Sequence, residues 1–389
     1  MSTAFITPRL VRWARQRVQA THERIASKLR VDPRRVAAWE QGEERPTFKQ
    51  AHDLADCLSV PFGYLYLSSP PVEKTPLPDL RTLTGKRPKK LSPEFSDTLD
   101  DIIRKQEWYR EYLKEEGRSH IDFIGRFAVG DDVKQVAGDI QRVLGLSDEL
   151  RDEASTWEDF FTALVRQCEL KGILVFRNSV VGNDNYRHLS EKEFRGFAIA
   201  DDLAPIIFVN GQDSKTAQIF TLVHELAHLW IGQSGISNPN LRTRTSHPGN
   251  DTERYCNRVA AEVLIPESDF LQSWKDDIAT EENLRELSKA YKVSTSVVLR
   301  RAYELDVLGY GEFLRLLKIY EARWRRIRAK KQDGGDFHNI LLARNSSTLT
   351  KVLLEGTLEG RFSPRDAARL LGIRASTVEK IGEALVGVV

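Results

Sequence analysis

The chain has 389 residues, of which 29% are charged, and its formal net charge is only +2. This length is enough for several domains. A mean hydropathy of −0.42, with no apolar run near about eighteen residues, excludes a membrane-spanning helix. The N-terminus lacks the basic and apolar regions of a signal peptide, and the three widely spaced cysteines predict neither a disulfide framework nor a cysteine-based zinc site. We therefore expect a cytoplasmic protein.

The first fifty residues are basic, with eleven Lys and Arg against five Asp and Glu. Apolar spacing predicts an amphipathic helix from Leu10 to Val18 and a second over 22–29, after Thr21 as its N-cap. Asp32 is expected to cap a third helix that begins at Pro33, and a fourth is expected at 51–58. Two helices joined by a short turn, the second capped and basic, predict a helix-turn-helix.

The run from Ile25 to Gly42 resembles the XRE (Cro/CI-type) DNA-binding domain, and the likeness extends over residues 6–68. It implies an N-terminal five-helix domain that binds double-stranded DNA. The exposed first half of the third helix would read base edges through Arg34, Arg35, Ala38 and Gln41. Phosphate contacts, which position the protein without specifying sequence, are expected from Arg9, Arg12, Arg15 and Lys28. The alternatives are that these side chains only solvate a helical surface, or that the fold serves protein contacts.

Residues 69–90 combine proline, glycine and charge and predict a linker. Its basic cluster at 86–90 either adds DNA affinity or is simply solvated. An amphipathic helix is expected over 91–117. Beyond it, the apolar patterns predict helices near 131–145 and 155–169 and short strands at 172–176, 195–200 and 205–210. The stretch 232–250 is expected to be a mobile loop.

His224 and His228 belong to a His-Glu-x-x-His pattern inside an apolar segment that reads as a helix. Their spacing places both imidazoles on one helical face, where they can bind the same Zn²⁺ ion. Glu225 is then positioned to take a proton from a water molecule on the metal. The alternative is a charged patch on an ordinary amphipathic helix, but two His and a Glu in an apolar helix need partners for their polar atoms.

A zinc hydrolase needs a third protein ligand, and Glu253 is the candidate. Helical spacing aligns it with Asn257, which is expected either to orient a ligand histidine by a hydrogen bond or to be a plain surface residue. Glu262 lies nine residues after Glu253, so we expect it on the opposite side of the helix, in solvent. His247, in the expected loop, is a candidate for stabilising the oxyanion or a surface histidine.

Asn210, the run from Phe220 to His228 and the run from Glu253 to Pro266 together resemble the ImmA/IrrE metallo-endopeptidase domain (DUF955), over about residues 120–270. That family belongs to the gluzincins, whose zinc ligands are two His and one Glu. The chain departs from the usual pattern at Cys256, commonly Ala, and at Val259, commonly Phe; neither position is a ligand. The segment 77–82 resembles the one that joins the two domains in fused XRE–ImmA/IrrE proteins.

The C-terminal third carries less chemistry. Residues 284–301 resemble the short helix-turn-helix-like module that follows this peptidase domain, 313–331 predict a basic amphipathic helix, and 362–373 again have helix-turn spacing. They serve either as scaffold or as binding surfaces for DNA, partners or a sensed ligand. We expect a mainly α fold with a small antiparallel or mixed sheet (α+β). The expected domains are 1–70 (XRE-type), 71–119 (linker and connecting helix), 120–270 (metallopeptidase), 271–310 (helix-turn-helix-like) and 311–389 (helical).

These features predict a zinc-dependent endopeptidase fused to a DNA-binding domain. The resemblance implies that it cleaves an XRE-type transcriptional repressor in stress, mobile-element or toxin–antitoxin regulation. Its expected partners are double-stranded DNA, this protein substrate and a second copy in a homodimer, with no membrane. The alternative is a DNA-binding regulator or antitoxin whose peptidase fold acts as a sensor.

Overall fold

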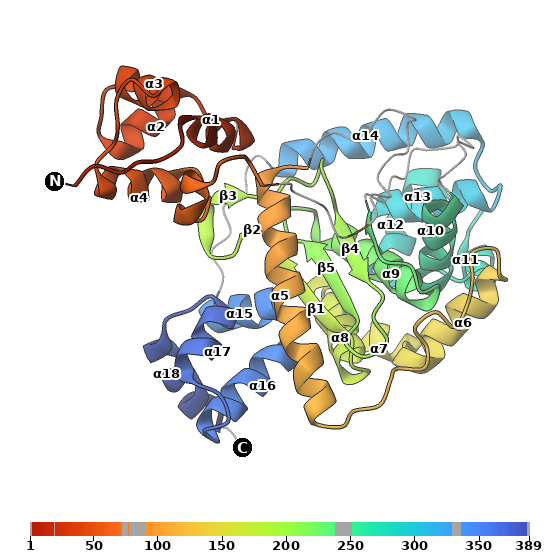
Figure 1. Cartoon of the computed structure of the whole chain (residues 1–389). Coiled ribbons are helices and arrows are strands. Elements are labelled where there is room, and N and C mark those ends of the chain that lie inside the picture. The colour runs from red at the N-terminus through yellow and green to blue at the C-terminus, as the bar shows by residue number, and fades with distance from the viewer. Residues whose placement is uncertain are drawn as a thin grey trace. The chain divides into compact units, whose positions relative to one another are not determined.

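The computed structural model describes residues 2–18, 20–71, 77, 91–237, 251–328 and 336–386. As predicted, they are mainly helical with a small mixed sheet (Figure 1). The contacts between Cα atoms divide the chain into two compact units. The first comprises Met1–Pro76 with Lys90–Asp97, and the second comprises Leu77–Lys89 with Thr98–Val389. No helix in the described parts is long and apolar enough to cross a membrane.

Unit 1 is helical. It contains α1 (Pro8–Arg17), α2 (His22–Leu29), α3 (Pro33–Gln41), α4 (Phe48–Cys57) and a short 3-10 helix, η1 (Phe62–Tyr66). The predicted caps are confirmed, because the side chain of Thr21 accepts from Arg24 N and that of Asp32 from Arg34 N. The fourth helix begins three residues earlier than expected, since Thr47 and Gln50 form a capping box before Phe48. Trp39 is buried in the centre of the unit.

Unit 2 contains most of α5 and the remaining elements. Its first helices, as Figure 1 labels them, are α5 (Pro93–Glu115), α6 (Val133–Leu144), α7 (Asp148–Glu153) and α8 (Trp157–Leu170). The strands are β1 (Leu174–Asn178), β2 (Val180–Val181), β3 (Asp184–His188), β4 (Gly196–Ile199), β5 (Ile206–Asn210) and β6 (Gly235–Ser237). Further helices are α9 (Lys215–Trp230), α10 (Asp251–Leu264), α11 (Glu267–Ser273), α12 (Thr280–Ala290), α13 (Thr295–Glu304) and α14 (Tyr310–Arg328).

The central sheet has the strand order β1-β5-β4-β6, with β1 parallel to β5 and the other pairs antiparallel. The three predicted strands correspond to β1, β4 and β5. The expectation that 232–250 is a loop throughout is wrong at its start, where Gly235–Ser237 form the edge strand β6. Three residues, one of them glycine, are too short for alternation to predict a strand. Residues 238–250 lie outside the described structure.

The two faces of the sheet differ in side-chain size. One face carries the stacked rings of Phe197 and Phe208, and Ile236 is the cross-strand partner of Phe197. On the other face, where Ala198 and Ile207 join the main core, β4 and β6 contribute only small residues. These are Gly196 opposite Ser237 and Ala198 opposite Gly235. Helix α9 packs on β4 and β5, and it is buried over nearly its whole length.

The C-terminal segment consists of α15 (Phe337–Asn345), α16 (Ser347–Leu358), α17 (Pro364–Leu371) and α18 (Ala375–Val386). Helix α15 packs along β1, the other edge strand of the sheet. Glu169, near the end of α8, accepts hydrogen bonds at the start of α16 from Ser346 Oγ (2.6 Å), Ser347 N (2.9 Å) and Thr348 N (3.3 Å). A carboxylate from one segment thus satisfies orphan N–H groups of a helix in another.

Candidate metal centre

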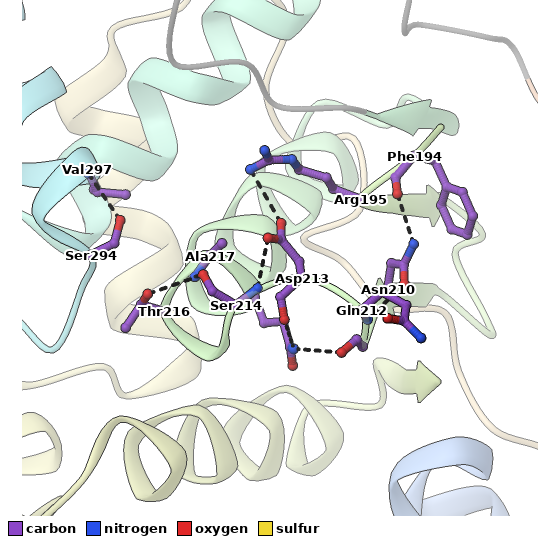
Figure 2. Close-up of polar contacts among 12 residues, drawn as sticks. Phe194, Arg195, Asn210, Gln212, Asp213, Ser214, Thr216, Ala217, Ser294 and Val297 are labelled. Carbon is purple, nitrogen blue, oxygen red and sulfur yellow. Dashed lines mark hydrogen bonds and ion pairs between the residues drawn. The ribbon is translucent and has the colours of Figure 1, made fainter. Parts of the chain in front are cut away.

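A polar turn sets the start of α9 and therefore the direction in which its side chains point. Figure 2 shows this turn: Asn210, at the end of β5, donates from Nδ2 to Phe194 O (3.0 Å) and accepts at Oδ1 from Gln212 N (3.0 Å). Ser214 then caps the helix by accepting from Ala217 N at 3.1 Å. Asn210 is fully buried. Its two hydrogen bonds hold the turn before α9, so the first residue of the family-like pattern anchors the start of this helix.

His224, His228 and Glu253 converge as the sequence predicts. The two imidazoles come from successive turns of α9 and the carboxylate from the first turn of α10, which packs against α9. His228 Nε2 lies 3.2 Å from His224 Nε2 and 3.0 Å from Glu253 Oε1, and His224 Nε2 lies 3.4 Å from Glu253 Oε2. All three side chains are buried. Among the described residues, they form the group of ligand-type side chains compatible with a metal site.

The geometry of this group fits a tetrahedral cation. Ligand atoms about 2.0–2.1 Å from such an ion lie about 3.3–3.4 Å from one another, close to the three separations above. At least one of the two facing Nε2 atoms is expected to point a lone pair into the centre, because two N–H donors that face each other at 3.2 Å would repel. His224 Nδ1 and His228 Nδ1 have no hydrogen-bond partner. Converging lone pairs in a buried centre are stabilised by a bound cation.

Burial and contact set the charges of the ligands. Burial lowers the pKa of His224, which favours the neutral imidazole that binds metals. Burial alone would raise the pKa of Glu253, but its contacts with His224 and His228 lower that pKa to about 2. Glu253 is therefore ionised at neutral pH and supplies the negative charge of the ligand set.

Glu225 lies beside the ligand cluster without belonging to it. It is fully buried, and its Oε1 has no hydrogen-bond partner. Burial and the nearby charge of Glu253 raise the pKa of Glu225 well above its ordinary value, although the Ser237 hydroxyl opposes the rise. A carboxylate with a raised pKa accepts a proton more readily than an exposed one. This environment suits the predicted general base.

Asn257 is on the face of α10 that carries Glu253, as predicted, and is half-buried. It lies close enough to His224 to oppose the fall in the pKa of that histidine. However, Asn257 Oδ1 and His224 Nδ1 form no hydrogen bond with any partner. The role of Asn257 in orienting a ligand therefore stays a prediction.

The expected solvation of Glu262 is wrong. Its side chain is buried and pairs with Arg301 of α13, which is also buried, and Glu262 Oε1 accepts from Glu267 N at 3.2 Å. Helical spacing correctly places Glu262 away from Glu253, but that side of α10 is covered by α13. Arg301 also donates to Ile265 O (3.0 Å). This second carboxylate of α10 therefore holds two helices together.

Ser237 is the neighbour of the centre that the sequence did not predict. Its Oγ lies 3.4 Å from each of Glu225 Oε2, His228 Nε2 and Glu253 Oε1. Across the sheet, Gly196 faces Ser237, and a Cβ added there would meet Glu225 Oε1 at 2.6 Å. The sequence offered no clear signal for this pair, because alternation over the three residues of β6 does not predict a strand.

The residues expected to contact DNA lie on unit 1 and differ in exposure and in their bonding partners. Arg34, Lys28 and Gln41 are exposed, and Ala38 is half-buried. Arg35 pairs with Glu44 at 3.0 Å. The exposed Arg12 also donates to Glu40 O at 3.2 Å. Arg15 is engaged inside the unit, because its Nε and Nη2 bind the buried carboxylate of Glu40 at 2.6 and 3.0 Å. His247 and the basic cluster at 86–90 lie outside the described residues.

Comparison with known families places this centre in a recognised domain. Residues 168–303, from the end of α8 to α13, match the IrrE N-terminal-like domain. Residues 345–384, which include α16 and α17, match a domain of unknown function (DUF8813). No curated protein matches the chain.

The first match contains all three ligand-type side chains and Glu225, and it supports a metallopeptidase of the IrrE/ImmA type. The resemblance to ImmA/IrrE proteins, predicted over about residues 120–270, is thereby confirmed over 168–270, and the match continues to residue 303. Neither match includes residues 1–70, so the resemblance of that segment to XRE domains stays a prediction.

Proposed function

We propose that the protein is a zinc-dependent endopeptidase whose metal is held by His224, His228 and Glu253. The observation that carries the proposal is the separation of 3.0–3.4 Å between their buried ligand atoms, which suits tetrahedral Zn²⁺. Two neutral imidazoles and one carboxylate form the ligand set typical of zinc peptidases. They leave one position free of histidine and carboxylate ligands.

Each residue has a distinct part in the hydrolysis. When bound, zinc would supply a Lewis acid that polarises the peptide carbonyl and activates a water molecule. Glu225, buried beside the ligands, takes the proton of the attacking water and passes it to the leaving amine. The ionised Glu253 and the two histidines stay fixed on α9 and α10. Burial excludes bulk water and strengthens the electrostatic interactions among these groups.

The proposal is tested by separating metal binding from hydrolysis. Metal analysis of the full-length protein should find about one zinc per chain, and His228→Ala or Glu253→Ala should lose most of it. Glu225→Gln should keep the zinc, because Glu225 is not a ligand, but should cleave a verified substrate about 10²–10⁴-fold more slowly. Equal zinc in all variants would refute the ligand assignment, and full activity of Glu225→Gln would refute the mechanism.

We further propose that unit 1 is an XRE-type helix-turn-helix that binds double-stranded DNA. Support comes from α2 and α3, which a short turn joins, and from Arg34 and Lys28, which are exposed. Arg35 and Arg12 would also reach DNA, Arg35 after release from its exposed pair with Glu44, which is worth little in stability. Ala38 and Gln41 complete the proposed base-reading set. Paired half-sites on DNA would require a homodimer.

The DNA-binding proposal predicts different effects for two arginines. In full-length protein bound to a duplex from its own upstream region, Arg34→Ala should relax base preference at one position and cost about 1–3 kcal/mol. Arg12→Ala should weaken all duplexes alike and flatten the dependence of affinity on salt. Equal affinity of the wild type for its own upstream region and for random duplex at low salt would instead assign unit 1 to protein recognition.

We propose an XRE-type repressor as the protein substrate, on the strength of the family resemblance. A second proposed function is that of a DNA-binding regulator whose peptidase fold acts as a sensor. One observation favours it: His224, Glu225 and His228 have no exposed surface, so a peptide cannot reach them in this structure. Incubation of the zinc-loaded protein with the XRE repressors encoded beside its gene distinguishes the two. Cleavage that Glu225→Gln abolishes supports the peptidase. Binding without cleavage supports the sensor.

A further inference from the structure

We infer that the Ser237 hydroxyl occupies the fourth position around the metal, which the reacting water needs, and that the structure shows a closed state of the site. This inference rests on the metal assignment under Proposed function. In this state, Ser237 must move away before a peptide can be cleaved. The edge strand β6, which carries Ser237, would thus control access to the centre.

The distances from Ser237 Oγ to two of the ligand atoms suit a fourth ligand of a tetrahedral ion. Ser237 Oγ lies 3.4 Å from His228 Nε2 and 3.4 Å from Glu253 Oε1. His228 Nε2 lies 3.2 Å from His224 Nε2 and 3.0 Å from Glu253 Oε1. These four separations are close to the edge of about 3.3–3.4 Å expected around a tetrahedral zinc ion. A serine placed beside the cluster for packing alone would have no reason to meet this spacing twice.

Hydrogen bonding alone explains the position of Ser237 poorly. A hydroxyl has one hydrogen to donate, yet Ser237 Oγ is equally far, at 3.4 Å, from the carboxylate oxygens Glu225 Oε2 and Glu253 Oε1 and from the ring nitrogen His228 Nε2. That distance is also long for an O–H···O bond, which is typically near about 2.7–2.8 Å. An oxygen that presents a lone pair to a cation at the centre of the cluster accounts for the near-equal separations.

The sheet holds Ser237 in this place through its pairing with β4. Arg195 N donates to Ser237 O at 3.1 Å, and Gly196 is the cross-strand partner of Ser237. A side chain at Gly196 would collide with Glu225 Oε1 at 2.6 Å and with Phe208 O at 2.9 Å. The missing side chain lets α9 lie close to the sheet, which brings the hydroxyl within reach of the ligands.

Ser237 also blocks the general base. Its Oγ contacts Glu225 Oε2, the group that should accept the proton of the attacking water. A neutral hydroxyl is a weaker zinc ligand than thiolate, imidazole or carboxylate, and β6 is only 3 residues long. A shift of this short strand would therefore free the fourth position and Glu225 together. Substrate that pairs with the sheet edge is suited to cause such a shift.

The test replaces the serine with a ligand that has a spectroscopic signature. In full-length protein loaded with Co²⁺, Ser237→Cys should place a thiolate on the metal and produce a sulfur-to-cobalt charge-transfer band in the near ultraviolet. It should also slow the loss of metal to a chelator by about tenfold, equivalent to about 1.4 kcal/mol, and stop hydrolysis. Ser234→Cys is the matched control, because Ser234 Oγ instead accepts from Ala200 N at 2.9 Å.

Ser237→Ala provides the complementary measurement. It should keep one Co²⁺ per chain, alter the visible cobalt spectrum and bind acetohydroxamate about tenfold more tightly, since no hydroxyl has to be displaced. A cobalt-loaded Ser237→Cys protein without the charge-transfer band would overturn the inference while leaving the metal site intact. A cobalt spectrum and a hydroxamate affinity that are unchanged in Ser237→Ala would also overturn the inference and leave the metal site intact. A wild-type protein that binds no Co²⁺ or Zn²⁺ would overturn the metal assignment itself.

Discussion

Glu253 and Glu262 are two buried carboxylates of the same helix with different partners. Their spacing of nine residues, two and a half helical turns, correctly predicts that they point in opposite directions. The structure shows that Glu253 is the carboxylate that meets the histidines. The sequence could not show that α13 covers the far side of α10. Arg301 of α13, which binds Glu262, lies 39 residues later in the chain. Periodicity describes one helix, whereas burial depends on its neighbours.

Substitution of the two glutamates should therefore affect different properties of the protein, zinc binding for Glu253 and stability for Glu262. Glu253→Gln should lose zinc. Glu262→Gln should keep zinc but lower the free energy of unfolding by about 3–5 kcal/mol, because it leaves the buried Arg301 without its partner. Metal analysis and chemical denaturation of the full-length variants measure the two effects. Glu286→Gln is the control, since Glu286 forms an exposed pair with Lys275 worth about 1 kcal/mol or less. Loss of zinc from Glu262→Gln would mean that the wrong carboxylate was chosen.

At the level of elements, the helix that carries the two histidines and the strands behind it were predictable. Short apolar runs bounded by turns predict the strands β1, β4 and β5. A long apolar stretch predicts α9. Strand β6 was not predictable, because its three residues are too few for alternation to indicate a strand. Gly196 falls within a predicted strand, but the sequence does not show that its missing side chain makes room for Glu225.

Gly196 lies so close to α9 that an added Cβ would meet Glu225 Oε1 at 2.6 Å. Gly196→Ala should lower hydrolysis by at least about tenfold while most zinc is kept, because the added Cβ displaces Glu225, for which small misplacements are costly, and touches no ligand. Gly138→Ala, within α6, is the control: a Cβ there meets nothing within 4 Å, so it should stabilise the protein by about 0.5–1 kcal/mol. Steady-state kinetics, zinc content and denaturation test both variants. Unchanged kinetics in Gly196→Ala would show that the base tolerates displacement.

Unit 2 joins the two family-matched segments through Glu169. This carboxylate belongs to the segment that matches the IrrE N-terminal-like domain, and it binds the start of α16 in the segment that matches the other family. Burial raises the pKa of Glu169, although Ser346 and the backbone of Ser347 oppose the rise. Sequence patterns could predict each helix but not this contact, which spans 178 positions.

Glu169→Ala should loosen the C-terminal segment by about 1–3 kcal/mol, because it leaves donors at the start of α16 unpaired, among them the hydroxyl of the buried Ser346. Hydrogen exchange of the full-length protein should show faster exchange in α16 with little change in α9. Glu116→Ala is the matched control, since Glu116 also reaches the C-terminal segment, through Arg361 at 3.0 Å, but is exposed. Equal effects of the two variants would mean that burial of Glu169 contributes nothing to docking.

The position of α15 along β1 has a consequence for the handling of the peptidase domain. Strand β1 ends the sheet, and an uncovered edge strand offers unpaired N–H and C=O groups to any other chain. In this protein a helix from beyond residue 336 covers that edge, and α6, from before residue 168, packs against α10. The matched residues 168–303 therefore omit two of the helices that pack on them. We expect these residues expressed alone to be more prone to strand-to-strand aggregation through β1 than the full-length protein.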